Sequence, residues 1–230
     1  GYTLEQFKEQ CKVVNPSGTV FSCADASYIY SHVKEQGSAT NYPITLPEPE
    51  PAPGNGSYQF ANTTALQTAV NLWVSDKPTT LSTYGEINTW DTSLVTNMYQ
   101  LFSNKLTFND DISNWNVSNV TNMDRMFIEA NAFNQPINTQ QVTDISGNTY
   151  TAWDVSKVTN MFKMFLASAF NQPIGNWDIS NVTSMNSMFS VTTAFNQPIN
   201  TQQVTVNNVT YTAWDVSNIT SLKSIFSRAD

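Results

Sequence analysis

The sequence is poor in the residues that most catalytic and metal-binding sites use. It contains a single histidine, His32, and only two cysteines among its 230 residues. The sequence shows no motif that pairs a serine or cysteine nucleophile with an activating base, and neither clusters of metal ligands nor glycine-rich phosphate loops. We therefore expect no enzymatic activity, no cofactor and no bound metal.

Basic residues and long apolar segments are also scarce. Lysine and arginine together number 10 against 18 aspartates and glutamates, which gives a net charge of −8. Because phosphate groups are bound by clustered basic side chains, this composition argues against nucleic acid as a partner, and equally against an anionic membrane surface. No apolar run approaches the roughly 20 residues that span a bilayer, so we expect no direct membrane insertion.

What the sequence contains instead is a repeat. Five copies begin with tryptophan in the pattern W-[DN]-[VIT]-S, with methionine or leucine eight residues later and phenylalanine after twelve. Fixed offsets over five copies indicate units that stack and bury a shared core. The copies begin at Trp90, Trp115, Trp153, Trp177 and Trp214.

Each copy is predicted to form a short strand followed by a short helix. In the segment 112–127, Trp115 and Val117 alternate as on one face of a strand, and Met123 and Phe127 have helical spacing. The predicted fold class is an α/β repeat solenoid of the leucine-rich-repeat type, with the methionine and phenylalanine side chains in its core. Its parallel strands are expected at 87–92, 112–117, 153–155, 177–179 and 214–216.

Two copies carry an insertion of twelve or thirteen residues just before the tryptophan. In "VTVNNVTY", β-rich runs flank Asn207-Asn208, and in "VTDISGNTY" the expected turn is at 146–148. Such runs about a short turn are typical of a β-hairpin. Because insertions at equivalent points of a repeat array project from one side, we expect both hairpins on the same side, two repeats apart.

The pattern "FNQPI-x-x-WDVSNVTNM-x-x-MF" is similar to that of the BspA-like, mycoplasma-type leucine-rich-repeat surface proteins, over residues 58–230. The resemblance implies surface display, attachment to molecules of a host or neighbouring cell, and no enzymatic activity. It supplies no fixed binding residues. The segment 58–89 resembles the N-terminal cap of such arrays, with Leu66, Val70 and Trp73 at helical spacing, and the repeats occupy 90–230.

The first 57 residues lie outside this resemblance. We expect a small helical module at 1–46 and a proline-rich linker at 47–57. In an extracellular protein Cys11 and Cys23 would form a disulfide, which would stabilise such a small module by about 3 kcal/mol. The alternative is two free buried thiols in a cytosolic protein.

Candidate binding residues come from two parts of the repeat. The residue after each tryptophan points out of the predicted sheet, so these side chains would form a polar row. They either accept hydrogen bonds from backbone N–H groups at a turn, or form a concave acidic surface for a basic or polyhydroxylated partner. Calcium is a third interpretation, although the glycine-rich calcium repeats of β-helices are missing. The row is Asp91, Asn116, Asp154, Asp178 and Asp215.

The inserted hairpins supply the second set of candidates. A copy without an insertion already closes the core, so the hairpins are not needed for stacking. We expect them to contact the partner as a paired projection, unless they pair edge to edge and only shield a flank. Their candidate contact residues are Val142, Tyr150, Val204 and Tyr211.

The sequence therefore favours a non-enzymatic, extracellular or cell-surface module for adhesion or ligand binding. The expected partner is a protein or glycan on a host or neighbouring cell. The alternative is a structural subunit or tip of a larger extracellular assembly that self-assembles, with residues 1–57 as its connector.

Overall fold

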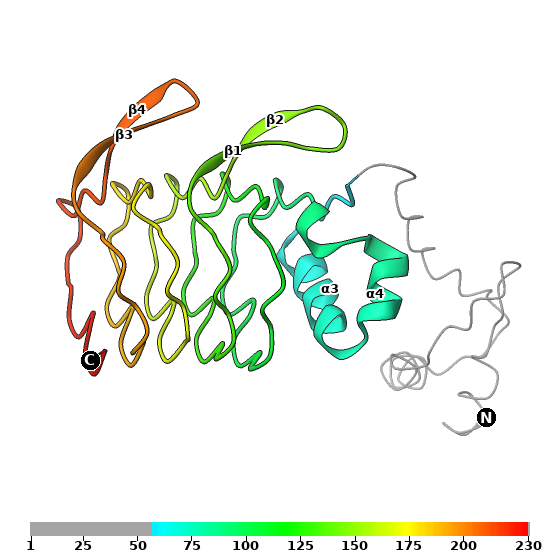
Figure 1. The fold of residues 1–230 in the computed structure, drawn as a ribbon, viewed down its shortest axis with the longest axis horizontal. Coiled ribbons are helices and arrows are strands. Elements are labelled where there is room, and N and C mark those ends of the chain that lie inside the picture. The colour runs from blue at the N-terminus through cyan, green and yellow to red at the C-terminus, as the bar shows by residue number, and fades with distance from the viewer. Residues whose placement is uncertain (1–56, 230) are drawn as a thin grey trace, which may run out of the picture. The chain divides into compact units, whose positions relative to one another are not determined.

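The computed structural model describes residues 57–229 (Figure 1). The chain divides into two units, Gly1–Glu48 and Pro49–Asp230, and the described residues all belong to the second. The helical module and linker predicted for the start of the chain, with the Cys11–Cys23 disulfide, lie outside the described residues, apart from Ser57 at the end of the linker.

Regular secondary structure occupies a small part of the described residues. Five coils built mainly from turns are stacked in chain order, and we number them 1 to 5 in the order of their tryptophans (Figure 1). The regular elements are α3 (Thr63–Ser75), α4 (Lys77–Tyr84), the 3₁₀ helix η2 (Ile87–Thr89), and the strands β1 (Gln140–Thr143), β2 (Thr149–Ala152), β3 (Gln202–Val206) and β4 (Val209–Ala213).

Helices α3 and α4 cover the N-terminal end of the coils (Figure 1). The side chain of Asn62 accepts a backbone N–H bond at 3.0 Å and caps α3. One face of α3 buries Leu66, Val70 and Trp73, as their spacing predicts. The Trp73 ring lies edge-on to Trp90 of coil 1, with 5.6 Å between centroids. The helices therefore close the apolar core at that end.

Backbone hydrogen bonds join each coil to the next. The N–H groups of Met123, Arg125, Phe127 and Glu129 in coil 2 all donate to carbonyl oxygens of coil 3, at 2.9 Å. Equivalent groups of coils 1 and 3 donate to coils 2 and 4. Isolated parallel bridges link the coils seven residues after each of the first four tryptophans. The coils therefore run parallel to one another.

The helices predicted within the repeats do not form. In coil 2, Met126 N–H donates to the Met123 carbonyl and Ile128 N–H to the Arg125 carbonyl, which makes tandem β-turns. Arg125 and Glu129 have φ of 55° and 56°, as the third residue of such turns requires. The N–H groups of Arg125, Phe127 and Glu129 donate to the next coil. The turns with a positive φ, 123–126 and 127–130, begin four residues apart, so they place apolar side chains on one side with nearly helical spacing.

The predicted parallel strands are also absent among residues 57–229. The segment 87–92 begins with η2 instead. Between the tryptophan segments of successive coils there is at most one backbone hydrogen bond. Trp153 N–H donates to Trp115 O and Trp214 N–H to Trp177 O, both at 3.1 Å. The residue after each tryptophan enters a turn at once, so pairing stops before a strand can form.

The methionine and phenylalanine side chains form the core, as the repeat predicts, in coils 1 to 4. Successive phenylalanine rings stack with centroids 5.2 to 5.7 Å apart. The fifth copy departs from the prediction, because Leu222 is 47% exposed and Phe226 is 45% exposed. No described coil covers them. The fully buried rings of the column are Phe102, Phe127, Phe165 and Phe189.

Polar side chains hold the coils in register. The Trp177 indole N–H donates to Ile137 O at 2.9 Å, and the same bond runs from each tryptophan of coils 2 to 5 to the isoleucine carbonyl of the preceding coil. Asparagines that follow a phenylalanine in coils 1 to 4 form a second ladder, in which each side-chain oxygen accepts the backbone N–H of the next asparagine. This ladder is Asn109, Asn134, Asn171 and Asn196.

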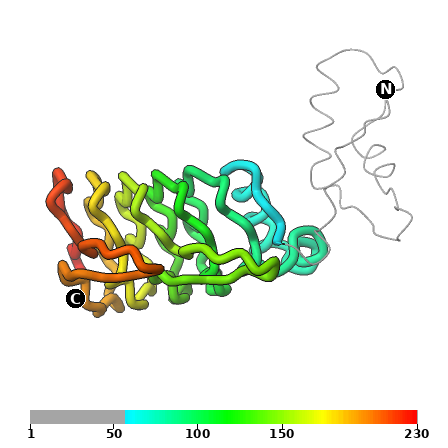
Figure 2. Tube along the Cα trace, turned by 90° about the horizontal axis from the view of Figure 1, so that it is seen from above, coloured from blue at the N-terminus to red at the C-terminus, as the bar shows by residue number. Residues whose placement is uncertain are grey.

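Both insertions form antiparallel hairpins at the predicted positions. Asn207 and Asn208 turn the β3–β4 hairpin with φ of 52° and 63°, and Gly147 turns the β1–β2 hairpin with φ of 85°. The hairpins project from the same side of the coils and lean toward the N-terminal end (Figures 1 and 2). They are two separate sheets, so the alternative that the hairpins pair edge to edge is wrong. One side-chain bond, from Asn207 to Thr151, joins them.

Candidate functional site

The polar row after the tryptophans forms a series of turns. The side-chain oxygen of Asp91 accepts the Ser93 N–H at 2.9 Å, and that of Asn116 accepts the Ser118 N–H at 3.1 Å. The three later members make the same bond to the serine two residues on. Hydrogen bonding at a turn, the first interpretation of this row, is therefore what the structure shows. These members are Asp154, Asp178 and Asp215, each at 3.0 Å.

Each hairpin packs against the coil that precedes its insertion. The Tyr150 hydroxyl donates to Asn114 O of coil 2, and the Tyr211 hydroxyl donates to Asn176 O of coil 4. Both rings are partly buried against the core, as are Val142 and Val204. Burial raises the pKa of both tyrosines, and nearby aspartates raise it further. The tyrosine bonds fix how far each hairpin stands from the coils.

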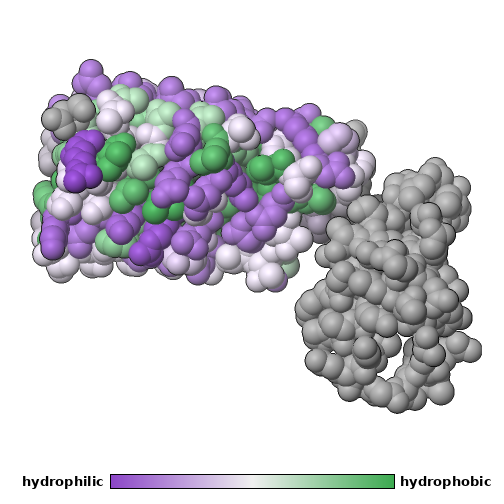
Figure 3. All heavy atoms as spheres, turned by 90° about the horizontal axis from the view of Figure 1, so that it is seen from below, coloured by the Kyte–Doolittle hydropathy of each residue, from purple (hydrophilic) through white to green (hydrophobic). Residues whose placement is uncertain are grey.

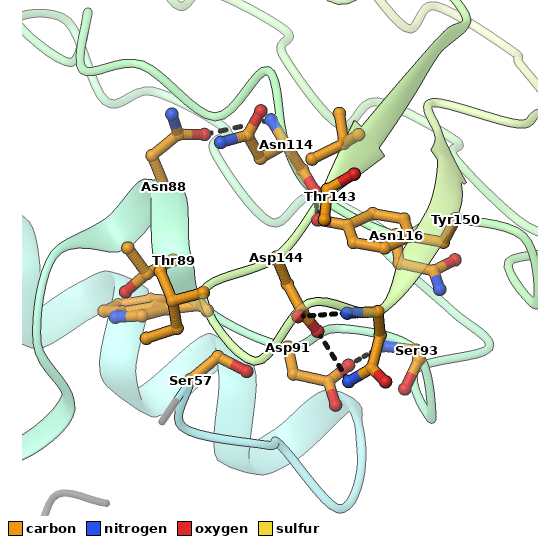
Figure 4. Close-up of a pocket in the computed structure, with 14 residues that line it drawn as sticks. Ser57, Asn88, Thr89, Asp91, Ser93, Asn114, Asn116, Thr143, Asp144 and Tyr150 are labelled. Carbon is orange, nitrogen blue, oxygen red and sulfur yellow. Dashed lines mark hydrogen bonds between the residues drawn. The ribbon is translucent and has the colours of Figure 1, made fainter. Parts of the chain in front are cut away.

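A pocket of about 260 Å³ lies between the β1–β2 hairpin and coils 1 and 2. It brings together four of the predicted residues, two from the polar row and two from the hairpin. Asp91 and Asn116 line it from coils 1 and 2, and Val142 and Tyr150 line it from the hairpin. Figure 4 shows Asp91, Asn116 and Tyr150 around the pocket. The remaining predicted residues, which line no part of this pocket, are Asp154, Asp178, Asp215, Val204 and Tyr211.

Asp144 is a pocket residue that the repeat pattern did not reveal. It comes from the hairpin turn and lies across from Asp91 of coil 1 (Figure 4). Its carboxylate accepts the backbone N–H groups of Ser146 and Asn148, both at 2.8 Å, and the Asn148 side-chain amide at 3.1 Å. The bonds from Asn148 hold the pKa of Asp144 below its ordinary value. The sequence signal was an aspartate two residues before Ser146-Gly147-Asn148, a pattern typical of a side-chain-stabilised turn.

The β3–β4 hairpin has no counterpart of Asp144. Its turn is one residue shorter, and Val206 follows Val204 and Thr205 where the first hairpin has the aspartate after Thr143. Its tip is also held against β2 by the bond from Asn207 to Thr151. The two insertions are therefore alike in their packing on the coils but different at their tips.

The rest of the described molecule offers few alternative sites. In residues 57–229 there is no group of three or more histidines, cysteines, aspartates or glutamates placed to hold a metal ion. No helix in that range has the length and apolar character needed to cross a bilayer. The face opposite the hairpins mixes apolar and polar side chains (Figure 3). The pocket under the β1–β2 hairpin is therefore the candidate site.

Protonation of Asp144 is expected to loosen the hairpin turn only in strong acid. Because the folded-state pKa is depressed, the turn is fully stabilised above the ordinary aspartate value of 3.8 and loses this stabilisation as pH falls through the lower folded value. The backbone amide resonances of Ser146 and Asn148 should titrate with a midpoint below 3.8, measured by NMR. In the Asp144→Asn control, which retains an acceptor oxygen, this transition should vanish. A midpoint at or above 3.8 would contradict the turn geometry.

Comparison with known proteins gives one family. A family model described as "Mycoplasma protein of unknown function, DUF285" matches residues 79–152 and 140–230. These two matches together cover all five coils and both hairpins. No curated protein and no solved structure matches the chain.

Proposed function

The chain belongs to the family described as Mycoplasma protein of unknown function, DUF285, and from this premise we propose that it is a non-enzymatic binding module. The finer assignment is a leucine-rich-repeat-like solenoid of the BspA-like type, carried on a cell surface or secreted. It attaches to a protein or glycan of a host or neighbouring cell. The stacked coils supply a rigid support, and the hairpin side supplies the contact.

The observation that carries this proposal is the pocket under the β1–β2 hairpin. Stacking does not require a hairpin, because coil 4 has none and its Trp177 is fully buried. The hairpin nonetheless encloses a pocket of about 260 Å³ with a mainly polar lining. At the tips of the two hairpins, Ile145 and Val209 are each 62% exposed. Ile145 also lines the pocket, so the pocket has an exposed apolar side chain among its polar lining.

Shortening the insertions tests the proposal. Coil 1 joins its isoleucine and tryptophan through Asn88-Thr89, and Asn88 accepts the Asn114 N–H of the next coil at 2.9 Å. Replacing 139–152 by one threonine copies this link and keeps Asn138, which accepts the Asn176 N–H. The equivalent change in the second insertion replaces residues 201–213 by one threonine. We expect the doubly shortened protein to fold and to lose attachment to immobilised glycans and matrix proteins.

The single shortenings separate the two hairpins. Because the pocket lies under the β1–β2 hairpin alone, loss of 139–152 should abolish attachment, whereas loss of 201–213 should reduce it less. Circular dichroism and thermal unfolding of each variant serve as the folding control. A folded, doubly shortened protein that attaches as well as the original would refute the proposal.

A further inference from the structure

We infer that the pocket under the β1–β2 hairpin binds one uncharged sugar ring of a glycan, an inference that rests on the proposed function. The pocket is slightly smaller than the roughly 300–1,000 Å³ of sites for drug-sized ligands. A single ring therefore fits it better than a long chain. Its lining residues are Asn, Ser, Thr, Asp and Tyr, with Trp90, Val142 and Ile145 as the apolar members.

The charge of the lining excludes anionic ligands. Asp91 and Asp144 both line the pocket, and no lysine or arginine does. Since the Asn148 bonds hold the pKa of Asp144 low, this carboxylate is ionised at neutral pH. A phosphate, a sulfate or a sugar carboxylate would meet like charge with no compensating cation. The ligand is therefore neutral or cationic.

The amide groups of the lining favour a neutral ligand over a cation. The Asn116 side-chain oxygen already accepts the Ser118 N–H at 3.1 Å and the Ser118 hydroxyl at 2.7 Å. What Asn116 offers a ligand is its NH₂ group, which has no partner among the described residues. The Asn114 side-chain amide is likewise unbonded within residues 57–229. An ammonium or guanidinium group only donates, so it cannot use these N–H donors, whereas a sugar hydroxyl both donates and accepts.

The hydrogen-bond acceptors and the apolar side chains of the lining also suit a sugar ring. Asp91 and Asp144 are carboxylates whose existing hydrogen bonds fix their orientation, yet each oxygen pair retains lone pairs for a hydroxyl donor. Val142 and the ring of Tyr150 place apolar surface beside them, which suits the C–H face of a sugar. Because the Tyr150 hydroxyl donates a hydrogen bond to Asn114 O, the Tyr150 side chain is already fixed before a ligand binds, and binding costs little conformational entropy there.

The substitution Asn116→Asp tests the inference, because it should weaken the binding of a neutral sugar but tighten the binding of a cation. Four of the five repeats carry aspartate at this position and make the same turn, so the substitution is compatible with the fold. It removes the NH₂ group with its two N–H donors and adds a negative charge. For a neutral sugar we expect at least tenfold weaker binding. For a cationic ligand the added charge would instead tighten binding.

The probes are the methyl glycosides of glucose, galactose, mannose and N-acetylglucosamine, with lysine amide and arginine amide as the cationic set. Binding is measured by calorimetry and by NMR of the Asn116 side-chain amide. Asp215→Asn is the matched control, because Asp215 makes the same turn outside the pocket. We expect one of the glycosides to bind, binding to be insensitive to ionic strength, and the control to bind like the original protein.

Two results would overturn the sugar assignment: no glycoside binds, or the amides bind and Asn116→Asp tightens them. Neither result would contradict the proposed function, provided that the protein without residues 139–152 still loses attachment. Attachment that survives the loss of both hairpins refutes the proposed function itself. Failure of the sugar assignment is therefore detected with Asn116→Asp, and failure of the proposed function with the shortened variants.

Discussion

Trp177→Ala should lower the free energy of unfolding by about 3–5 kcal/mol, the range expected for truncating a buried aromatic side chain. Trp177 is fully buried, and its ring stacks on Trp153 with 6.4 Å between centroids. Its indole N–H is also the donor for Ile137 O at 2.9 Å. The substitution therefore removes apolar contacts and leaves a buried carbonyl of the preceding coil without its partner.

The destabilisation should reach the neighbouring coils, because each coil is stabilised mainly by the two that flank it. Chemical denaturation with tryptophan fluorescence and amide hydrogen exchange measures both the size and the spread of the effect. Trp177→Phe is the control: it keeps a ring in the core but removes the donor, so an intermediate loss is expected. An unchanged denaturation midpoint for Trp177→Ala would place the tryptophans on the surface.

The second large effect is expected for Phe165→Ala, again about 3–5 kcal/mol, because both faces of this ring are covered. It stacks on Phe127 at 5.5 Å and on Phe189 at 5.7 Å between centroids. Phe226 holds the same position in coil 5 but stacks on Phe189 alone and is 45% exposed. Phe226→Ala should therefore cost much less, about 1 kcal/mol.

These two variants are a matched pair, since they remove the same side chain from the same position of the repeat. Equal losses in thermal or urea unfolding would mean that coil 5 is covered in solution as coil 3 is, in contradiction to the exposure of Phe226. A large difference would show that stability comes from the side chains that cover Phe165, which are the next coil and Phe170 at 4.2 Å between centroids, because Phe226 has no counterpart of either.

The repeat made the core and the hairpins predictable. Tryptophan, methionine and phenylalanine recur at fixed offsets, so burial of one copy implies burial of the others, and the structure confirms this except at Leu222 and Phe226. Asn207-Asn208 tolerate the positive φ of a tight hairpin turn, which made that hairpin visible in the sequence. Both features depend on residues that are close together or exactly periodic in the chain.

The candidate site was predictable only in pieces. Asp91 and Asn116 belonged to one hypothesis, and Val142 and Tyr150 to another, and the structure unites them in one pocket. These residues line one pocket because the hairpin packs toward the preceding coils. The hydrogen bond from the Tyr150 hydroxyl to Asn114 O, which lies 36 residues earlier in the chain, fixes that orientation. A sequence pattern shows which residues an insertion contains, but it does not show the direction in which the insertion packs.

The sequence by itself determined the number of repeats, their register, the buried residues of coils 1 to 4 and the positions of both hairpins, because periodicity and local turn chemistry encode them. Only the tertiary structure decided the backbone between Met123 and Phe127 and its equivalents. A four-residue spacing of apolar side chains fits a helix and a series of β-turns equally well. The turns form because alternate N–H groups donate to the next coil, and that acceptor exists only once the coils are stacked.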